Sequence, residues 1–84
     1  MTTLDTNYPI PPQYLHAYRG PVVERRLSLS DVQSLCGFGA GACAFYTSDH
    51  GCLLIISNQG PESVATYRRH ETAHCNGWAG SHPR

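Results

Sequence analysis

The sequence predicts a small α+β domain in which a three-stranded antiparallel or mixed sheet packs on one long helix, with one short additional helix. Three runs rich in β-branched, aromatic and other apolar residues predict the strands, and one later segment with helical periodicity predicts the long helix. The chain has 84 residues, which suffice for a single domain. At this size a hydrophobic core alone is marginal, so a metal ion or disulfides are expected to supplement it.

The first expected strand covers residues 22–29, where apolar and charged residues partly alternate. Ser30 then has the character of a helix N-cap, with Asp31 in the favourable first turn. A short helix is expected over residues 31–35, and Gly37 ends it. Only one or two helical turns fit into this segment.

Two further strands are expected at residues 42–47 and 52–57. The segment between them, residues 48–51, has the sequence Ser-Asp-His-Gly, which is typical of a turn. Because two apolar runs are joined by so short a turn, we expect them to form an antiparallel hairpin.

The last expected element is a long helix over residues 61–75. Pro61 suits the first turn of a helix, because its fixed φ is helical and its missing N–H has no partner there in any case. The Asn76-Gly77 pair supplies a left-handed cap that ends the helix, and Trp78 can then fold back against the core.

The first 21 residues are rich in proline, tyrosine and polar residues, and they are expected to form an extended arm. The arm comprises residues 1–21 and precedes a single domain over residues 22–84. Such an arm can wrap around the domain or bind a protein partner. The polar start of the chain has neither the basic nor the hydrophobic region of a signal peptide.

The charge balance argues against two classes of partner. The formal net charge is +0 at neutral pH, so no overall field favours nucleic acid or an anionic membrane. No stretch approaches the roughly eighteen apolar residues that a membrane span requires. We therefore expect neither nucleic acid nor a membrane span.

The four cysteines permit up to two disulfides, in any of three pairings. Our preferred pairing joins Cys36 to Cys43 and Cys52 to Cys75, and the second bond would tie the start of a strand to the end of the long helix. The alternative is that some cysteines are buried thiols, which are common in protein cores. Disulfides would favour an extracytoplasmic or virion-associated location, which the sequence alone leaves open.

Residues 70–74 have the sequence His-Glu-Thr-Ala-His, an HExxH pattern. His70 and His74 are four residues apart, so on a helix both rings project from one face and can bind one tetrahedral zinc ion. Glu71 stands beside the first histidine, where its carboxylate can accept a proton from water that the zinc has acidified. The pattern therefore predicts Zn²⁺ as the cofactor and hydrolysis as the chemistry, against the alternative that it arises by chance.

The helical phase of this segment supports the zinc interpretation. At about 100° per residue, the apolar residues share one face with His70, Glu71 and His74, whereas Ala73 falls on the opposite side. Polar groups on an inward face are costly unless they are paired, and a metal ion would satisfy them.

The string HExxHxxG, formed by His70, Glu71, His74 and Gly77, resembles that of the zincin metallopeptidases. The order of elements is similar to the sheet and active-site helix of that fold, over about residues 22–82. The longer string HExxHCNGW resembles that of a group of small bacterial or phage proteins. The resemblance implies a minimal zincin-like peptidase whose strand 52–57 is an edge onto which an extended peptide could add.

Catalytic zinc usually has three protein ligands and one water, so a third ligand is expected. In one branch of the zincins a third histidine stands at the position that is Gly80 here. The next histidine is His82, which we assign as the third ligand, with Gly77 and Gly80 letting the tail turn back over the helix. The alternative third ligands are His50, Asp49 and His16.

Tyr46 and Tyr67 are candidates for stabilising a developing oxyanion, against the alternative that they are packed tyrosines with hydrogen-bonded hydroxyls. The leading hypothesis is a zinc-dependent hydrolase, specifically a metallopeptidase that cleaves a peptide or protein substrate. In it the HExxH histidines and His82 bind zinc, and Glu71 is the general base. The alternatives are a non-catalytic, zinc-stabilised structural or accessory protein, such as a phage protein, and a disulfide-stapled binding domain whose arm engages another protein.

Overall fold

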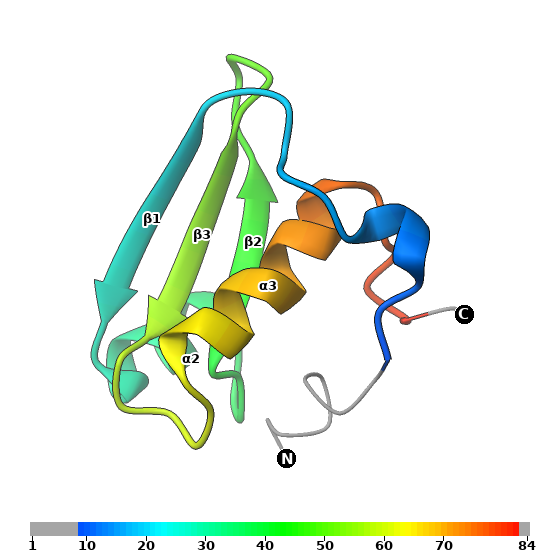
Figure 1. The fold of residues 1–84 in the computed structure, drawn as a ribbon. Helices are drawn as coiled ribbons and strands as arrows, with labels where there is room; N and C mark the ends of the chain where they lie inside the picture. The colour runs from blue at the N-terminus through cyan, green and yellow to red at the C-terminus, as the bar shows by residue number, and fades with distance from the viewer. Residues whose placement is uncertain (1–8, 83–84) are drawn as a thin grey trace.

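A computed structural model describes residues 9–82, so residues 1–8 of the expected arm and residues 83–84 of the expected domain lie outside the description. The architecture is a mixed three-stranded sheet with a long helix across one face (Figure 1), which confirms the predicted α+β class. The elements in chain order are the 3₁₀ turn η1 (Pro12–Tyr14), β1 (Val22–Leu27), α2 (Leu29–Cys36), β2 (Ala42–Tyr46), β3 (Cys52–Ser57) and α3 (Val64–Cys75).

The strand order is β1-β3-β2, with β1 parallel to β3 and β2 antiparallel to it. The expected hairpin of β2 and β3 is therefore present. The prediction that residues 52–57 form an edge strand is wrong, because β3 lies in the centre of the sheet. Its sequence Cys-Leu-Leu-Ile-Ile-Ser is apolar on both faces and almost wholly buried, as is typical of a strand covered on both sides. The two edges of the sheet are β1 and β2.

The core lies between the sheet and α3. Leu54 and Ile56 of β3 project from one face and pack with Ala42 of β2 and with Tyr67 and Cys75 of α3. The opposite face of the sheet receives α2, whose Val32 is fully buried. Fully burying an aliphatic side chain stabilises a fold by roughly 1.5–3 kcal/mol, so these few contacts supply much of the stability of so small a domain.

Each helix has a serine as its N-cap, and neither serine is the residue at which the sequence predicted the helix to begin. α3 starts after Ser63 instead of at Pro61, and α2 starts after Ser28 instead of after Ser30. In each case the backbone of the serine is extended and its Oγ accepts the N–H three residues further on, which satisfies a donor that the helix leaves unpaired. Because Ser28 is a cap, β1 ends at Leu27, two residues earlier than predicted.

The end of α3 follows the predicted Asn-Gly cap. Gly77 has φ 108°, and its N–H donates to the carbonyl of His74 at 3.0 Å. Trp78 donates to the carbonyl of Ala73 at 3.1 Å, which completes a Schellman motif. Trp78 is only 2 % exposed, as expected from the sequence. Ala73 is buried, contrary to its predicted outward position. The chain after α3 folds back over the last helical turn, where the backbone N–H of Trp78 donates to the carbonyl of Ala73.

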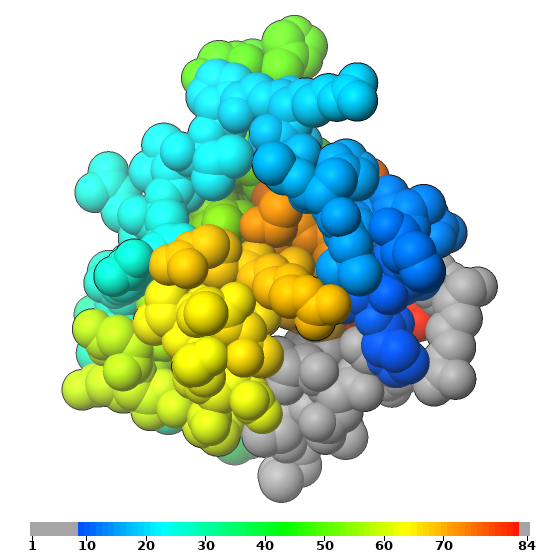
Figure 2. Space-filling view, viewed as in Figure 1, coloured from blue at the N-terminus to red at the C-terminus, as the bar shows by residue number. Residues whose placement is uncertain are grey.

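The arm lies alongside the outer side of α3 (Figure 1). The Asn76 side chain donates to the carbonyls of Tyr14 and His16, at 3.0 and 2.6 Å. Further along, the Tyr18 hydroxyl donates to the carbonyl of His50 in the β2–β3 turn at 2.8 Å. Figure 2 shows the arm resting on α3, and a cavity of about 360 Å³ lies between residues 14–17 and the helix. Residues 9–21 therefore wrap the domain and contain one 3₁₀ turn.

Both disulfides have the preferred pairing. Cys36 bonds to Cys43, with a Cα–Cα distance of 5.6 Å, and Cys52 bonds to Cys75, with a Cα–Cα distance of 6.2 Å. The first joins α2 to β2, and the second joins the start of β3 to the end of α3. Two disulfides fit an oxidising, extracytoplasmic compartment. Within residues 9–82, no helix has the length and apolar character that crossing a bilayer requires.

Glu24 on β1 binds two arginines. Its Oε1 accepts from Arg68 Nε of α3 at 2.6 Å and its Oε2 accepts from Arg68 Nη2 at 3.0 Å, so the pair is bidentate. Arg26 Nε also donates to Oε2 at 2.7 Å. These contacts, the hydrogen bond from Arg68 above all, lower the pKa of Glu24 to about 2. The cluster ties the edge strand β1 to α3.

Removing the Cys52–Cys75 bond should destabilise the fold more than removing the Cys36–Cys43 bond, because it closes the longer loop, with sequence separations of 23 and 7. The double variant Cys52→Ala, Cys75→Ala is expected to lose about 3.5 kcal/mol of unfolding free energy, and Cys36→Ala, Cys43→Ala about 2.5 kcal/mol. Urea denaturation in the presence of a chelator measures both. An equal or reversed order would contradict the loop-length argument.

Glu24→Gln should lower the unfolding free energy by about 1 kcal/mol at neutral pH. The carboxyl has a pKa of about 2 when folded and 4.5 ordinarily, so its stabilisation is present above pH 4.5 and is lost as the pH falls through 2. The difference between variant and wild type, measured by denaturation across this range, should therefore shrink on acidification. Glu62→Gln, which removes a carboxylate outside the cluster, is the control. A pH-independent difference would exclude an ionic origin.

Candidate metal centre

Three histidine side chains meet at one point beside the C-terminal end of α3. The Nε2 atoms of His70 and His74 are 3.1 Å apart, and each is 3.2 Å from the Nε2 atom of His82. Among residues 9–82, these three form the one group of histidine, cysteine or acidic side chains arranged to hold a metal ion. The structure therefore brings together the three residues predicted as ligands.

Two different parts of the chain position these rings. His70 and His74 stand four residues apart on α3, so both project from the same face. His82 lies in the tail that follows α3, and its backbone N–H donates to the carbonyl of Ala79 in a tight turn at 2.9 Å. Its φ of 59° lies in the left-handed region, which few non-glycine residues adopt. Such a backbone conformation is common where a functional side chain must be aimed.

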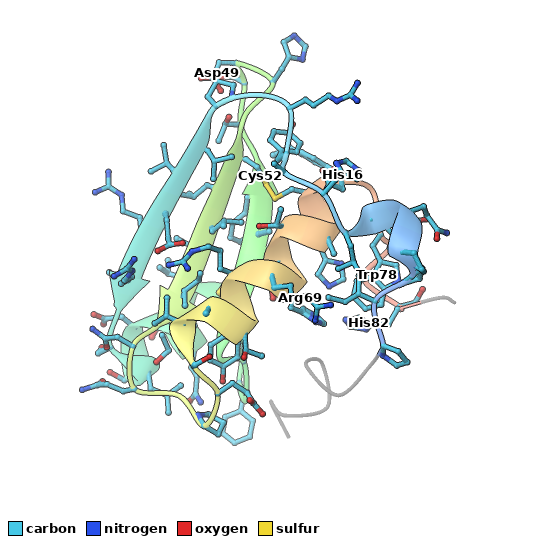
Figure 3. The ribbon with its side chains drawn as sticks, viewed as in Figure 1. His16, Asp49, Cys52, Arg69, Trp78 and His82 are labelled. Atoms are coloured by element: carbon cyan, nitrogen blue, oxygen red, sulfur yellow. A yellow bond between two sulfur atoms is a disulfide. The ribbon has the colours of Figure 1, made fainter. Side chains whose placement is uncertain are left out.

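Trp78 packs against all three imidazoles, and Figure 3 shows it next to His82. Its ring stacks on His74, with a centroid distance of 4.9 Å and an interplanar angle of 11°, and it meets His70 and His82 edge-on at 5.2 and 4.8 Å. An indole packed against all three rings restricts their rotation. The nitrogens are thus held close together by packing as well as by backbone geometry.

The tautomer of His74 suits metal binding. Its Nδ1 lies 2.8 Å from the carbonyl oxygen of Trp78, which can only accept, so Nδ1 carries the proton and donates it. The lone pair is then on Nε2, the atom that faces the other two rings. A ligand histidine oriented by a backbone carbonyl in this way is a common feature of metal sites.

The protonation state of His70 also leaves a nitrogen lone pair available for a metal ion. Its side chain is 2 % exposed, and burial, followed by the charges of His74 and His82, lowers its pKa to about 4. The ring is therefore neutral at pH 7 and its nitrogen lone pair is available. Three nitrogens within 3.2 Å of one another repel unless a proton or a cation lies between them, so this cluster could hold a metal ion.

Glu71 lies beside the histidine cluster in a cleft of about 240 Å³. The carboxylate side chain is only 6 % exposed, and it shares the cleft with His74 and His82. The opposite wall is small and apolar and consists of the Cys36–Cys43 disulfide with Ala40, Ala42 and Ala44. The arrangement places a carboxylate and two of the three imidazoles, those of His74 and His82, along one cleft.

The cleft runs along the free edge of β2. Gly41 accepts the N–H of Ser57 at 2.9 Å, so the main chain of Gly41 is directed toward β3. Hydrogen-bonding direction alternates along an antiparallel strand, which means that Ala42 and Ala44 direct their N–H and C=O groups to the other side. Among residues 9–82 no strand pairs with that side of β2, and Ala42 and Ala44 both line the cleft beside His74 and His82.

The remaining candidate residues lie elsewhere. Tyr46 donates its hydroxyl to the carbonyl of Cys75 at 3.0 Å, which caps the end of α3. The Tyr67 hydroxyl lies near the start of α3, where it accepts the N–H of Glu62 at 3.4 Å, and burial raises its pKa. His50, Asp49 and His16 are outside the cluster, and Figure 3 shows Asp49 at the top of the view, far from His82 at the right.

Sequence reasoning missed two parts of this site. Trp78 was expected only as a core residue, although its spacing of four from His74 is a signal that both belong to one cluster. The role of β2 as a cleft wall had no local signal, because strand order depends on pairing between distant segments. Comparison of the chain with protein-family models, with curated proteins and with solved structures gave no match.

His82→Ala should weaken zinc binding by at least about a hundredfold, because it leaves two of three ligands. Competition against a chromophoric chelator measures the affinity. His50→Ala, a histidine outside the cluster, is the matched control and should bind zinc as tightly as wild type. Equal affinities for the two variants would remove His82 from the ligand set.

Proposed function

We propose that this chain is a zinc-dependent hydrolase, specifically a small metallopeptidase. The observation that carries the proposal is the convergence of three imidazole nitrogens, two of whose residues, His74 and His82, line one cleft with the buried Glu71. The HExxHxxG string resembles that of the zincin metallopeptidases, which also supports a metallopeptidase function.

Zinc fits the ligand set better than other common ions. Three imidazole nitrogens suit zinc, whereas magnesium and calcium prefer oxygen ligands. Nitrogens 2.0–2.1 Å from a tetrahedral zinc ion lie about 3.3 Å apart, and those of His70, His74 and His82 are separated by 3.1–3.2 Å. Three protein ligands also leave the fourth position open, as in catalytic sites.

When bound, zinc supplies Lewis acidity, which makes a water nucleophilic near neutral pH and polarises a carbonyl. The chain supplies the rest. Glu71 accepts the proton of the attacking water and afterwards donates it to the leaving amine. The hydrogen bond from His74 to the carbonyl of Trp78 holds the imidazole in one orientation throughout, so the ligand does not reorganise during the reaction.

The free edge of β2 is suited to hold the substrate. An extended peptide that adds to this edge would bond to the main chain of Ala42 and Ala44, with its own backbone lying in the cleft beside Glu71. A scissile carbonyl is then brought next to the histidine cluster by backbone hydrogen bonds alone. This favours an unfolded or extended segment over a folded substrate surface.

A second candidate function is a zinc-stabilised protein without catalytic activity. It is favoured by the tail, where Ala79, Gly80 and Ser81 are exposed and His82 returns to the metal-binding cluster. In this reading the ion anchors the tail and adds to a small core. It assigns no chemistry to Glu71.

Glu71→Gln separates the two functions. The variant should keep its zinc and should lose hydrolysis of an unstructured peptide by about a hundredfold to ten-thousandfold, because general acid–base catalysis contributes about that much. A fluorogenic peptide assay with metal analysis of the same sample measures both properties. Glu62→Gln, whose carboxylate is outside the cleft, is the control and should hydrolyse normally.

Two outcomes would decide against the peptidase. If the zinc-loaded wild type hydrolyses no peptide, and if chelation lowers its unfolding free energy, the ion is structural. If Glu71→Gln and wild type hydrolyse peptide at equal rates, another group is the base.

A further inference from the structure

The loop between α2 and β2 presents a phenylalanine to solvent. Phe38 is 101 % exposed, so its ring makes no packing contact with the fold. It stands between Gly37 and Gly39, whose φ values are 113° and 86°. Residues with a side chain rarely adopt such positive φ values. The Cys36–Cys43 disulfide closes this loop at its base. The aromatic ring therefore projects into solvent from a loop whose ends the disulfide joins.

This loop forms one side of the metal-binding cleft. Cys36 and Ala40, two residues before and after Phe38, both line the cleft with Glu71 and His82. Leu35, in the last turn of α2, is 58 % exposed. Two large apolar side chains thus stand in solvent next to residues that wall the cleft, where they do not contribute to the core.

We propose that Phe38 and Leu35 select substrates with a large apolar side chain next to the scissile bond. The inference rests on the proposed metallopeptidase function and names the substrate class of the same site. Large apolar side chains that stand exposed beside a cleft favour an apolar partner group, because both apolar surfaces leave water when they pack together.

The geometry of β2 explains which substrate residues would meet this loop. Side chains along a strand alternate between the two faces of a sheet. The Ala42 side chain packs against α3, so the next side chain, Cys43, faces α2, to which the disulfide joins it. A peptide added to the edge of β2 would likewise point every second side chain toward the α2 face. Those side chains meet Phe38 and Leu35, and the alternate ones face α3.

The test uses binding, so that it does not depend on turnover. Two peptide hydroxamates of equal length, which chelate zinc and differ only in a leucine or a serine side chain, are titrated into the zinc-loaded chain by calorimetry. Wild type should bind the leucine compound about tenfold more tightly, the difference expected when one large aliphatic group is buried. In Phe38→Ser this preference should fall to about twofold.

Val23 lies on β1, the opposite edge of the sheet, and is 47 % exposed without lining the cleft. Val23→Ser is therefore the control for loss of an exposed apolar side chain, and it should keep the tenfold preference. Leu35→Ser should reduce the preference independently, and it serves as the second variant if Phe38→Ser folds poorly.

Each result decides a different claim. If both hydroxamates bind wild type equally, or if Phe38→Ser and Leu35→Ser keep the full preference, the specificity inference is wrong and the metal site stands. If neither hydroxamate binds the zinc-loaded chain, the proposed function fails, and the specificity inference fails with it.

Discussion

The candidate site depends on the turn that ends α3. Gly77 adopts a backbone conformation that residues with a side chain rarely take, and two backbone hydrogen bonds return the chain over the last helical turn. The turn places Trp78 against the imidazoles of the helix and directs the tail so that His82 reaches the same point. Without this reversal, α3 would present two histidines spaced for a metal ion and no third ligand.

Several independent contacts hold that helix end in place. The Cys52–Cys75 disulfide ties it to β3, the hydroxyl of Tyr46 on β2 binds the carbonyl of Cys75, and the side chain of Asn76 binds the arm. These attachments all fall within two residues of His74. Ligand geometry in a metal site requires a rigid surrounding shell, and in a domain with so small a core covalent and polar contacts supply that rigidity.

The mixed sheet explains why the cleft has two chemically different walls. Because β1 pairs with β3 from the far side, β2 becomes an edge beside the histidine cluster. α3 supplies the imidazoles and Glu71, whereas β2 and the disulfide loop supply backbone groups and apolar surface. The proposed chemistry and the proposed substrate recognition are therefore carried by separate elements that meet only in the folded chain.

Local patterns in the sequence were enough to predict the α+β class, the HExxH helix and its Gly77 end, because helical periodicity and turn residues act over short distances. The preferred cysteine pairing is the one found, although the sequence permitted three pairings or free thiols. His82 could be proposed from the two glycines before it. The predicted start of α3 was wrong. Pro61 and Ser63 are both residues at which a helix can begin, and only the packing of the helix in the fold decides between them. The central position of β3 was also missed. Strand order follows from which apolar faces become covered when distant segments meet, so the edge that borders the cleft beside the histidine cluster was decided only by tertiary packing.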